Sequence, residues 1–138
     1  LAEANCLPLL QRLCDAGHAV SLETSGALPV DQVDPRVSRV VDVKTPDSGE
    51  AHRNLLDQLD ALGRGDQLKF VICSRSDYEW SRQLVQERNL ADRTMVLFSP
   101  SHDQVAARDM AEWILADGLP VRLQVQLHKI LWGNEPGR

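Results

Sequence analysis

Several features are missing from this chain, and each absence argues against a class of function. The 138 residues carry 15 Lys or Arg and 20 Asp or Glu, and the net charge of -5 argues against a nucleic-acid backbone partner. No apolar run approaches the length of a membrane span, and no charged segment followed by an apolar run indicates a signal peptide. HExxH, nucleophile-elbow, GxGxxG and phosphate-loop motifs are all missing. We therefore expect a cytoplasmic protein with neither a membrane nor a direct nucleic-acid partner.

Cysteine is scarce, and its spacing is not that of a disulfide framework. The three cysteines, Cys6, Cys14 and Cys73, are odd in number and form no CxxC pair. Cys6 and Cys14 lie on one face of an expected helix but two turns apart, which is too far for a disulfide. We expect free thiols in a reducing compartment.

Composition and length are those of one globular domain covering residues 1–138. Apolar residues make up 43% of the chain and charged residues 25%, which is ordinary for a globular protein with a core of its own. The first residue is Leu1 rather than Met. This start indicates either processing or the later part of a longer protein.

Apolar runs alternate with helical patterns along the chain. Strands are expected at residues 18–25, 39–45, 68–73, 95–98 and 121–130. Helices are expected at residues 5–17, 49–62, 76–88 and 101–118, the last two opened by the capping boxes Ser76–Glu79 and Ser101–Gln104. This alternation predicts an α/β fold in which crossover helices connect a parallel sheet. Five strands cannot close an eight-stranded barrel, so an open doubly wound sheet and part of a barrel both remain possible.

Polar clusters follow several of these strands, where the ligands of parallel sheets bind. Asp42 and Lys44 alternate on one strand and therefore share a face. Together they suit a zwitterionic ligand, with the ligand ammonium on Asp42 and its carboxylate on Lys44. A purely internal ion pair explains the same spacing.

Two other strand ends carry candidate ligand groups. Glu23 and Thr24 suit hydroxyl or amino groups, or they form a simple turn before Gly26. Ser101 is an expected helix cap, but a helix start beside His102 also suits an anionic group.

The last expected strand alternates strictly between apolar and polar residues. Gln124, Gln126 and His128 share its polar face. That face is a hydrogen-bonding wall for a heterocycle if it looks into a barrel, and a solvent-facing surface if the strand is an edge.

A set of ordered segments resembles a known family. LETSGALP, VVDVKTPDSGE, LKFVI, VLFSPSH and LQVQLHKILWG are similar to the later part of radical S-adenosylmethionine enzymes of the 7-carboxy-7-deazaguanine synthase family. The resemblance extends from Leu1 to Gly133, and the QLHK segment is its most telling piece. It implies a shortened (β/α) barrel, of which this chain is the C-terminal part.

The resemblance also implies a reaction. In the family, a 4Fe-4S cluster on three cysteines cleaves S-adenosylmethionine to a radical that takes hydrogen from 6-carboxy-5,6,7,8-tetrahydropterin. Ring contraction then expels ammonia with the help of Mg2+ and gives 7-carboxy-7-deazaguanine for queuosine and 7-deazapurine synthesis. The expected partners are the pterin substrate, a reductant such as flavodoxin and, in a homodimer, a second copy.

Site residues follow from the matching segments. The residues expected to bind S-adenosylmethionine are Asp42, Val43, Lys44, Ser99, Pro100, Ser101, His102 and, on a bordering strand, Glu23 and Thr24. His128 and the terminal Arg138 are expected to contact the pterin. No catalytic side chain and no metal ligand is expected within the chain.

The chain departs from the family in one respect. The three-cysteine motif, the magnesium-binding hydroxyl and a GGEP segment are expected before Leu1, and the spacing of the three cysteines present does not replace that motif. We therefore expect a fragment that is inactive alone. The alternatives are another radical S-adenosylmethionine enzyme, such as an activase, and a non-catalytic α/β binding module.

Overall fold

The computed structural model describes residues 1–133 and 135 and contains one parallel sheet. Its strands are β1 (Ser21–Thr24), β2 (Ser38–Val43), β3 (Gln67–Ile72), β4 (Met95–Pro100) and β5 (Arg122–Leu123). Every neighbouring pair is parallel, and the spatial order equals the sequence order. The expected α/β parallel sheet is confirmed. A doubly wound sheet reverses its strand order part of the way along, whereas a barrel does not, so the order selects the barrel-like arrangement.

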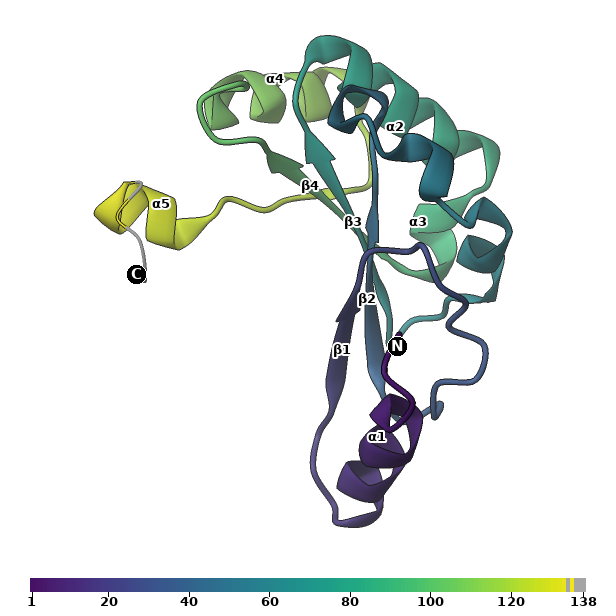
Figure 1. Ribbon diagram of the computed structural model, residues 1–138. Helices are drawn as coiled ribbons and strands as arrows, with labels where there is room; N and C mark the ends of the chain where they lie inside the picture. Colours follow the sequence, from purple (N-terminus) through teal and green to yellow (C-terminus); the bar gives the residue numbers. More distant parts are fainter. Residues whose placement is uncertain (134, 136–138) are drawn as a thin grey trace.

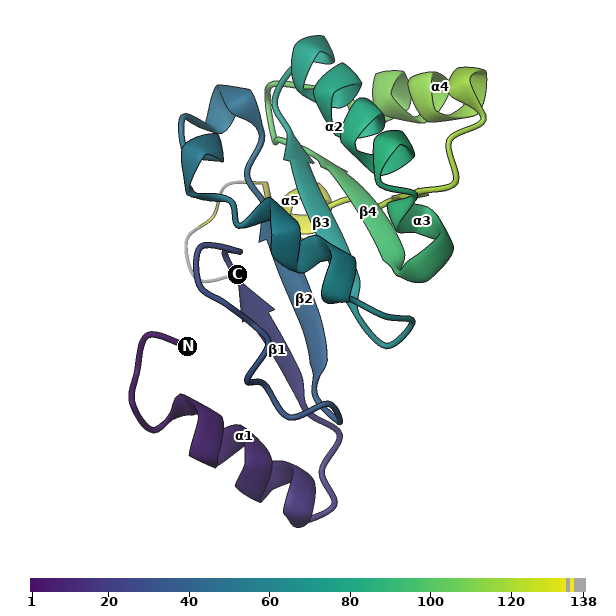
Figure 2. The same ribbon diagram turned by 90° about the vertical axis from the view of Figure 1, so that its right-hand side faces the viewer.

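The helices cover one face of this sheet. Figures 1 and 2 show α2 (Arg75–Glu87), α3 (Leu90–Arg93) and the other connecting segments on one side, with α5 (Leu127–Trp132) on the opposite side. The core lies between the sheet and these connections, which include α1 (Cys6–Asp15) and α4 (Ala107–Asp117). Its sheet side consists of alternate strand residues, namely Val41, Val43, Leu68, Phe70, Ile72, Val96 and Phe98. The strand residues between them face the other side, which we call the concave face.

Aromatic contacts join the sheet to two helices. The Phe98 ring packs against Phe70 and Tyr78 with centroid distances of 5.4 and 5.8 Å, and Tyr78 contacts Trp113 at 5.3 Å. The Tyr78 hydroxyl donates to Asp117 Oδ2 at 2.7 Å. Burial, together with this hydrogen bond to a carboxylate, raises the pKa of Tyr78. α2 and α4 are thus connected over β4.

The helix expected at residues 49–62 is absent, and that prediction is wrong. Three short 3-10 segments occupy the region: η1 (Pro46–Ser48), η2 (Ala51–Arg53) and η3 (Leu56–Ala61). A helix is interrupted here because Asn54 binds the backbone of Lys44 and the Leu55 N–H donates to the Gly26 carbonyl. These groups serve neighbouring strand ends instead of an intrahelical ladder.

Both expected capping boxes are misplaced. α2 begins at Arg75, and its cap is Ser74, whose Oγ accepts the Asp77 N–H at 3.1 Å. α4 begins only at Ala107, so Ser101 is not its cap. The Ser101 N–H instead donates to the Ile72 carbonyl at 2.8 Å, which continues the β3–β4 pairing, while its hydroxyl contacts the Gln104 side chain.

The first expected helix, at residues 5–17, is confirmed as α1. Leu10 and Cys14 are buried, but Leu9 is exposed. Asn5 occupies the cap position without a capping hydrogen bond. Gly17 follows the helix with a φ of +84°, which suits a residue without Cβ. The three cysteines are free thiols, as expected.

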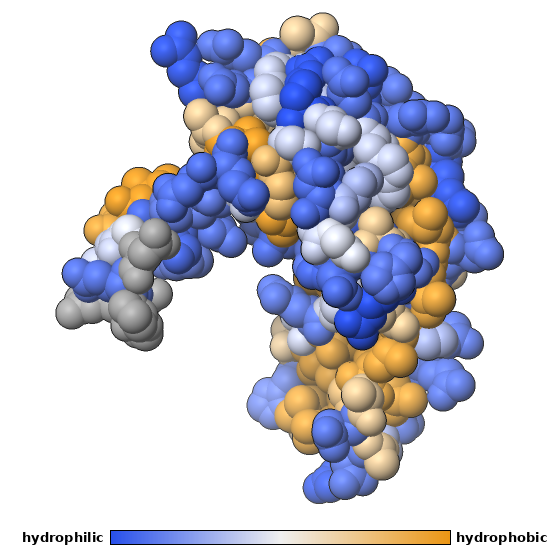
Figure 3. All heavy atoms as spheres, turned by 45° about the horizontal axis from the view of Figure 1, so that its top comes forward, coloured by the Kyte–Doolittle hydropathy of each residue, from blue (hydrophilic) through white to orange (hydrophobic). Residues whose placement is uncertain are grey.

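The prediction of a long final strand at residues 121–130 is also wrong. β5 ends at Leu123, the Gln124 N–H makes one further bond to the Phe98 carbonyl at 2.8 Å, and the chain then leaves the sheet for α5. The backbone of Pro100, two residues after Phe98, faces β5 as the backbone of Phe98 does. Because proline has no N–H, Pro100 cannot donate the next hydrogen bond of the β4–β5 ladder. Four apolar residues of α5 are exposed, namely Leu127, Ile130, Leu131 and Trp132. Figure 3 shows apolar surface on the arm that projects from the sheet.

Candidate functional site

Strand register brings the polar residues that end β2 and β4 to one rim of the concave face. Val43, Phe70 and Phe98 are register partners in the buried core. The residues one step further along their strands, Lys44, Val71 and Ser99, therefore lie on the concave side at one level. Ser101 pairs with the end of β3 just beyond that level. Lys44 and Ser101 thus share the carboxyl-end rim of the sheet.

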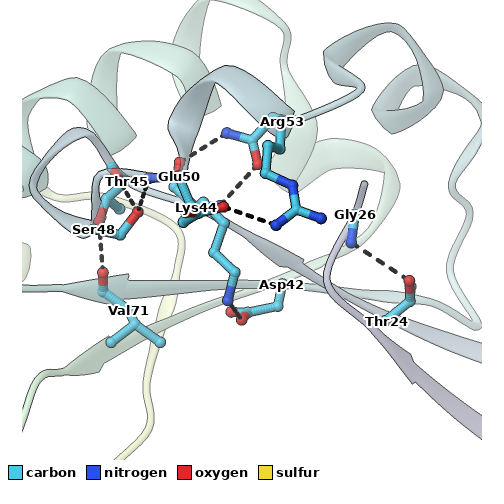
Figure 4. A network of polar contacts seen from close by, with 10 residues as sticks. Thr24, Gly26, Asp42, Lys44, Thr45, Ser48, Glu50, Arg53 and Val71 are labelled. Carbon is cyan, nitrogen blue, oxygen red and sulfur yellow. Dashed lines mark hydrogen bonds and ion pairs between the residues drawn. The ribbon is translucent and has the colours of Figure 1, made fainter. Parts of the chain in front are cut away.

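An ion pair between Lys44 and Asp42 lies at the exit of β2, and it leaves one oxygen of the Asp42 carboxylate without a partner among the described residues. Lys44 Nζ donates to Asp42 Oδ2 at 2.5 Å, and the two side chains are 33% and 27% exposed. Figure 4 shows the Lys44 side chain directed back toward Asp42. The other carboxylate oxygen, Asp42 Oδ1, is buried and has no hydrogen-bond partner in the described part of the chain. This oxygen can accept a donor from a ligand.

The backbone around Lys44 is fixed by side chains from three directions. The Asn54 amide binds both the N–H and the carbonyl of Lys44. Thr45 Oγ1 donates to the Val71 carbonyl at 2.9 Å (Figure 4). The buried Asp77 carboxylate accepts the N–H groups of Asp47 and Cys73, both at 3.0 Å. The exit of β2 is therefore tied to both β3 and α2.

A hollow of about 230 Å³ opens beside Asp42. Its lining includes Glu23, Thr24, Asp42 and Lys69, so two predicted strand-end clusters meet there. Lys69 is the register partner of Asp42 on β3. Among residues 1–133 and 135, its side chain makes no hydrogen bond or ion pair. The sequence analysis missed Lys69, although its place between the buried Leu68 and Phe70 marks it as a concave-face cation.

The exit of β4 contributes a second buried group. Ser99 is only 1% exposed, and its Oγ has no partner within the described residues. The side chains of Val43 and Pro100 are buried as well. Because Val43 faces the helix-covered core, it has only its backbone to offer a ligand at the rim.

A larger hollow of about 450 Å³ lies beyond β4. His102, Gln104 and Pro100 line one side of it, and Val125, Gln126 and Lys129 line the other. His102 Nε2 is 3.3 Å from Asp103 Oδ1. Two predicted residues, Pro100 and His102, thus face a space between the β4–α4 connection and residues 125–130.

A thiol also lies at this rim. Burial raises the pKa of Cys73, and a hydrogen bond with Ser101 opposes that shift only in part. The thiol is therefore protonated at neutral pH, in keeping with an unreactive cysteine.

Of the two alternatives for Gln124, Gln126 and His128, the hydrogen-bonding wall is not formed, because β5 is an edge strand that ends at Leu123. His128 lies in α5 with an exposed side chain, and it does not line either hollow. Arg138 lies outside the described residues. The pterin contacts of these two residues stay predictions.

The described residues offer no metal centre. Over residues 1–133 and 135, no three His, Cys, Asp or Glu side chains lie close enough together to hold an ion. Cys6 and Cys14 are on α1, and Cys73 follows β3. These three cysteines therefore do not fit a 4Fe-4S cluster. In the same part of the chain, no helix is long and apolar enough to cross a membrane.

Comparison with known proteins finds several relatives that share one name. No family model matches the chain. It is 39% identical to a 7-carboxy-7-deazaguanine synthase of Chlorobaculum tepidum, covering 98% of this chain and 63% of that protein. It is also 39% identical to a synthase of the same name from Koribacter versatilis, covering 98% of this chain and 66% of the relative. A third such synthase, from Methanospirillum hungatei, is 34% identical over 89% of this chain and 50% of the relative. The chain spans about two thirds of the length of the first two.

Proposed function

We propose that this chain, which belongs to the 7-carboxy-7-deazaguanine synthase family, provides the S-adenosylmethionine-binding rim of a radical S-adenosylmethionine lyase. The proposed reaction of the whole protein converts 6-carboxy-5,6,7,8-tetrahydropterin to 7-carboxy-7-deazaguanine with loss of ammonia. The family relationship supports the reaction, and the concave-face geometry supports the part assigned to this chain.

The Asp42–Lys44 pair carries the proposal. The methionyl end of S-adenosylmethionine has an ammonium and a carboxylate close together. The ligand ammonium would donate to the buried Asp42 Oδ1, which has no partner among the described residues, and the ligand carboxylate would accept from Lys44 Nζ. Binding then exchanges one internal ion pair for two charge-assisted contacts. This exchange requires a partly exposed pair, and both side chains are about one-third exposed or less.

Other rim groups suit the nucleoside end of the same ligand. Glu23 and Thr24 line the hollow beside Asp42 and can bind ribose hydroxyls. The Ser99 hydroxyl and the backbone from Pro100 to His102 border the same rim two strands away. Their spacing from β1 to β4 suits an extended ligand that lies along the strand ends.

The radical chemistry depends on groups that these residues do not hold. In the complete protein, S-adenosylmethionine bound beside a reduced 4Fe-4S cluster would supply the radical that removes hydrogen from the substrate. The cluster, Mg2+ and a reductant such as flavodoxin belong to the proposal for the whole protein, as does a homodimer. The residues of this chain orient the ligand and shield it on one side.

Replacing Lys44 tests the proposal. In the complete protein that contains this chain, Lys44→Ala should weaken S-adenosylmethionine binding roughly tenfold or more in calorimetry, because a charge-assisted hydrogen bond is lost. Arg108→Ala is the matched control. Arg108 is 87% exposed on α4 and, among the described residues, pairs with Glu112 alone, so its loss should leave the affinity unchanged. Equal affinities for wild type and Lys44→Ala would contradict the assignment of this rim.

Product analysis separates the two rival functions. Incubation of the reduced complete protein with 6-carboxytetrahydropterin and S-adenosylmethionine should yield 7-carboxy-7-deazaguanine. Cleavage of S-adenosylmethionine without this product would favour another radical enzyme, such as an activase. Ligand binding with no turnover of either compound would favour a binding module.

A further inference from the structure

We propose that Asn54 is a positioning residue that holds Lys44 in place for its ligand; this role rests on the function proposed above. Asn54 Oδ1 accepts the Lys44 N–H at 2.9 Å, and Asn54 Nδ2 donates to the Lys44 carbonyl at 2.8 Å. One side-chain amide thus satisfies both backbone groups that a neighbouring strand would otherwise bind. The β1–β2 pairing ends at Val41, three residues before Lys44, so Asn54 replaces a strand where the sheet has stopped.

The residues that follow Asn54 bind the exit of the adjacent strand. The Leu55 N–H and the Gln58 side-chain amide both donate to the Gly26 carbonyl, at 3.3 and 2.8 Å. Gly26 lies close to β2: a Cβ at this position would be only 3.3 Å from the Asp42 carbonyl oxygen. We call residues 54–58 the exit clamp. It joins the end of β1, beside Glu23 and Thr24, to the end of β2, which carries Lys44.

The exit clamp interrupts the helix that the sequence favours at residues 49–62. An uninterrupted helix over residues 49–62 would bury its leucines on one face, yet Leu55 is 40% exposed and the segment consists of separate 3-10 segments. Asn54 has extended backbone angles, with φ -66° and ψ 132°, and its amide is directed to the sheet. Departures from local preference of this kind are expected at functional positions.

Fixing the backbone leaves Lys44 only its side-chain torsions. The ammonium is then held beside Asp42 before a ligand arrives, which lowers the ordering cost of binding. Thr45 is anchored separately through Val71, so the strand end keeps a second attachment when Asn54 is replaced. An Asn54 variant should therefore fold while Lys44 becomes less well positioned.

The decisive variants are Asn54→Ala and Asn54→Asp in the complete protein. Asn54→Ala should weaken S-adenosylmethionine binding roughly fivefold by calorimetry although Lys44 is intact. Hydrogen exchange of the Lys44 amide should accelerate in the same variant, without any ligand. Asn54→Asp keeps the acceptor for the Lys44 N–H but loses the donor, so it should fall between Asn54→Ala and wild type in amide exchange.

Thr94→Ala is the matched control. Thr94 Oγ1 donates to the Asp66 carbonyl at 2.7 Å, a buried side-chain-to-backbone bond at the opposite rim. Its loss should reduce the melting temperature and leave the affinity within about twofold of wild type. Equal affinity losses in Asn54→Ala and Thr94→Ala would overturn the positioning role. Unchanged exchange of the Lys44 amide in Asn54→Ala would overturn it as well.

The proposed function and the positioning role can fail separately. If Lys44→Ala binds S-adenosylmethionine as wild type does, the ligand assignment of the rim fails. In that case the Lys44 amide exchange in Asn54→Ala decides whether Asn54 holds the strand end. Accelerated exchange with unchanged affinity in Asn54→Ala alone would leave the clamp a structural feature and overturn the link to ligand binding.

Discussion

Two ion pairs on β2, one at each end of the strand, differ in how completely they are satisfied. At the amino end, the Asp66 carboxylate accepts from the Arg39 backbone N–H, from Arg39 Nε and Nη2, and from the Gly63 N–H. Asp66 is 5% exposed. Burial alone would raise the pKa of Asp66, but these hydrogen bonds outweigh it and lower the pKa below its ordinary value.

At the carboxyl end, Asp42 receives one bond, from Lys44 Nζ, and its second oxygen is buried and unpartnered within the described residues. The Arg39–Asp66 pair leaves no capacity for a ligand, whereas the Asp42–Lys44 pair does. The comparison separates a structural ion pair from a candidate binding pair on one strand. It agrees with the division of parallel α/β barrels into a stabilising amino rim and a functional carboxyl rim.

The largest expected effect on stability comes from the amino-end pair. Asp66→Asn should lower the free energy of unfolding by about 3 kcal/mol, because it leaves the Arg39 guanidinium nearly buried without its counter-charge. Urea denaturation measures this change. Lys44→Ala should cost less than about 1 kcal/mol in the same assay, since its pair is partly exposed.

Acidification provides the control for this effect. The folded pKa of Asp66 is lowered from 3.8, so its stabilisation is fully present above that value and is lost as the pH falls through the folded pKa. The stability gap between wild type and Asp66→Asn should therefore be constant at neutral pH and narrow in strong acid. A gap that widened on acidification would contradict this account of Asp66.

A smaller effect, of opposite sign, is expected at the carboxyl rim. Ser99→Ala removes a buried hydroxyl that has no partner in the part of the chain described, so the variant should be as stable as wild type or more stable by about 1 kcal/mol. Its S-adenosylmethionine affinity should fall a few-fold. Thermal denaturation and calorimetry on the same samples check both. A clear loss of stability would show that the Ser99 hydroxyl is satisfied in solution and is structural.

Sequence periodicity predicted the sheet and most of its helices because those elements are set by local alternation. β3 shows this best: Leu68, Phe70 and Ile72 are buried while Gln67, Lys69 and Val71 between them are not. The same alternation placed Asp42 and Lys44 on one face. It left the choice between a doubly wound sheet and part of a barrel open, because strand order depends on long-range pairing.

The misses have physical causes that local patterns do not contain. The stripe of leucines in residues 49–62 favours a helix. Hydrogen bonds from Asn54 and Leu55 to distant strand ends interrupt it, so the segment does not form one. The alternation after Val121 predicts a long strand, but Pro100 on the neighbouring strand ends the ladder. The site residues Lys69 and Asn54 were missed for a related reason. Their roles depend on neighbours 27 and 10 residues away in the chain.

Differential hydrogen exchange with S-adenosylmethionine tests the central claim most directly. In the complete protein, saturated with ligand by calorimetric criterion, peptides covering residues 42–48 and 99–105 should become protected. Peptides covering residues 63–67 and 93–95, at the amino rim, should exchange as they do without ligand. Protection confined to the amino rim, or saturation with no protection at residues 42–48, would contradict the assignment of ligand binding to the carboxyl ends of the strands.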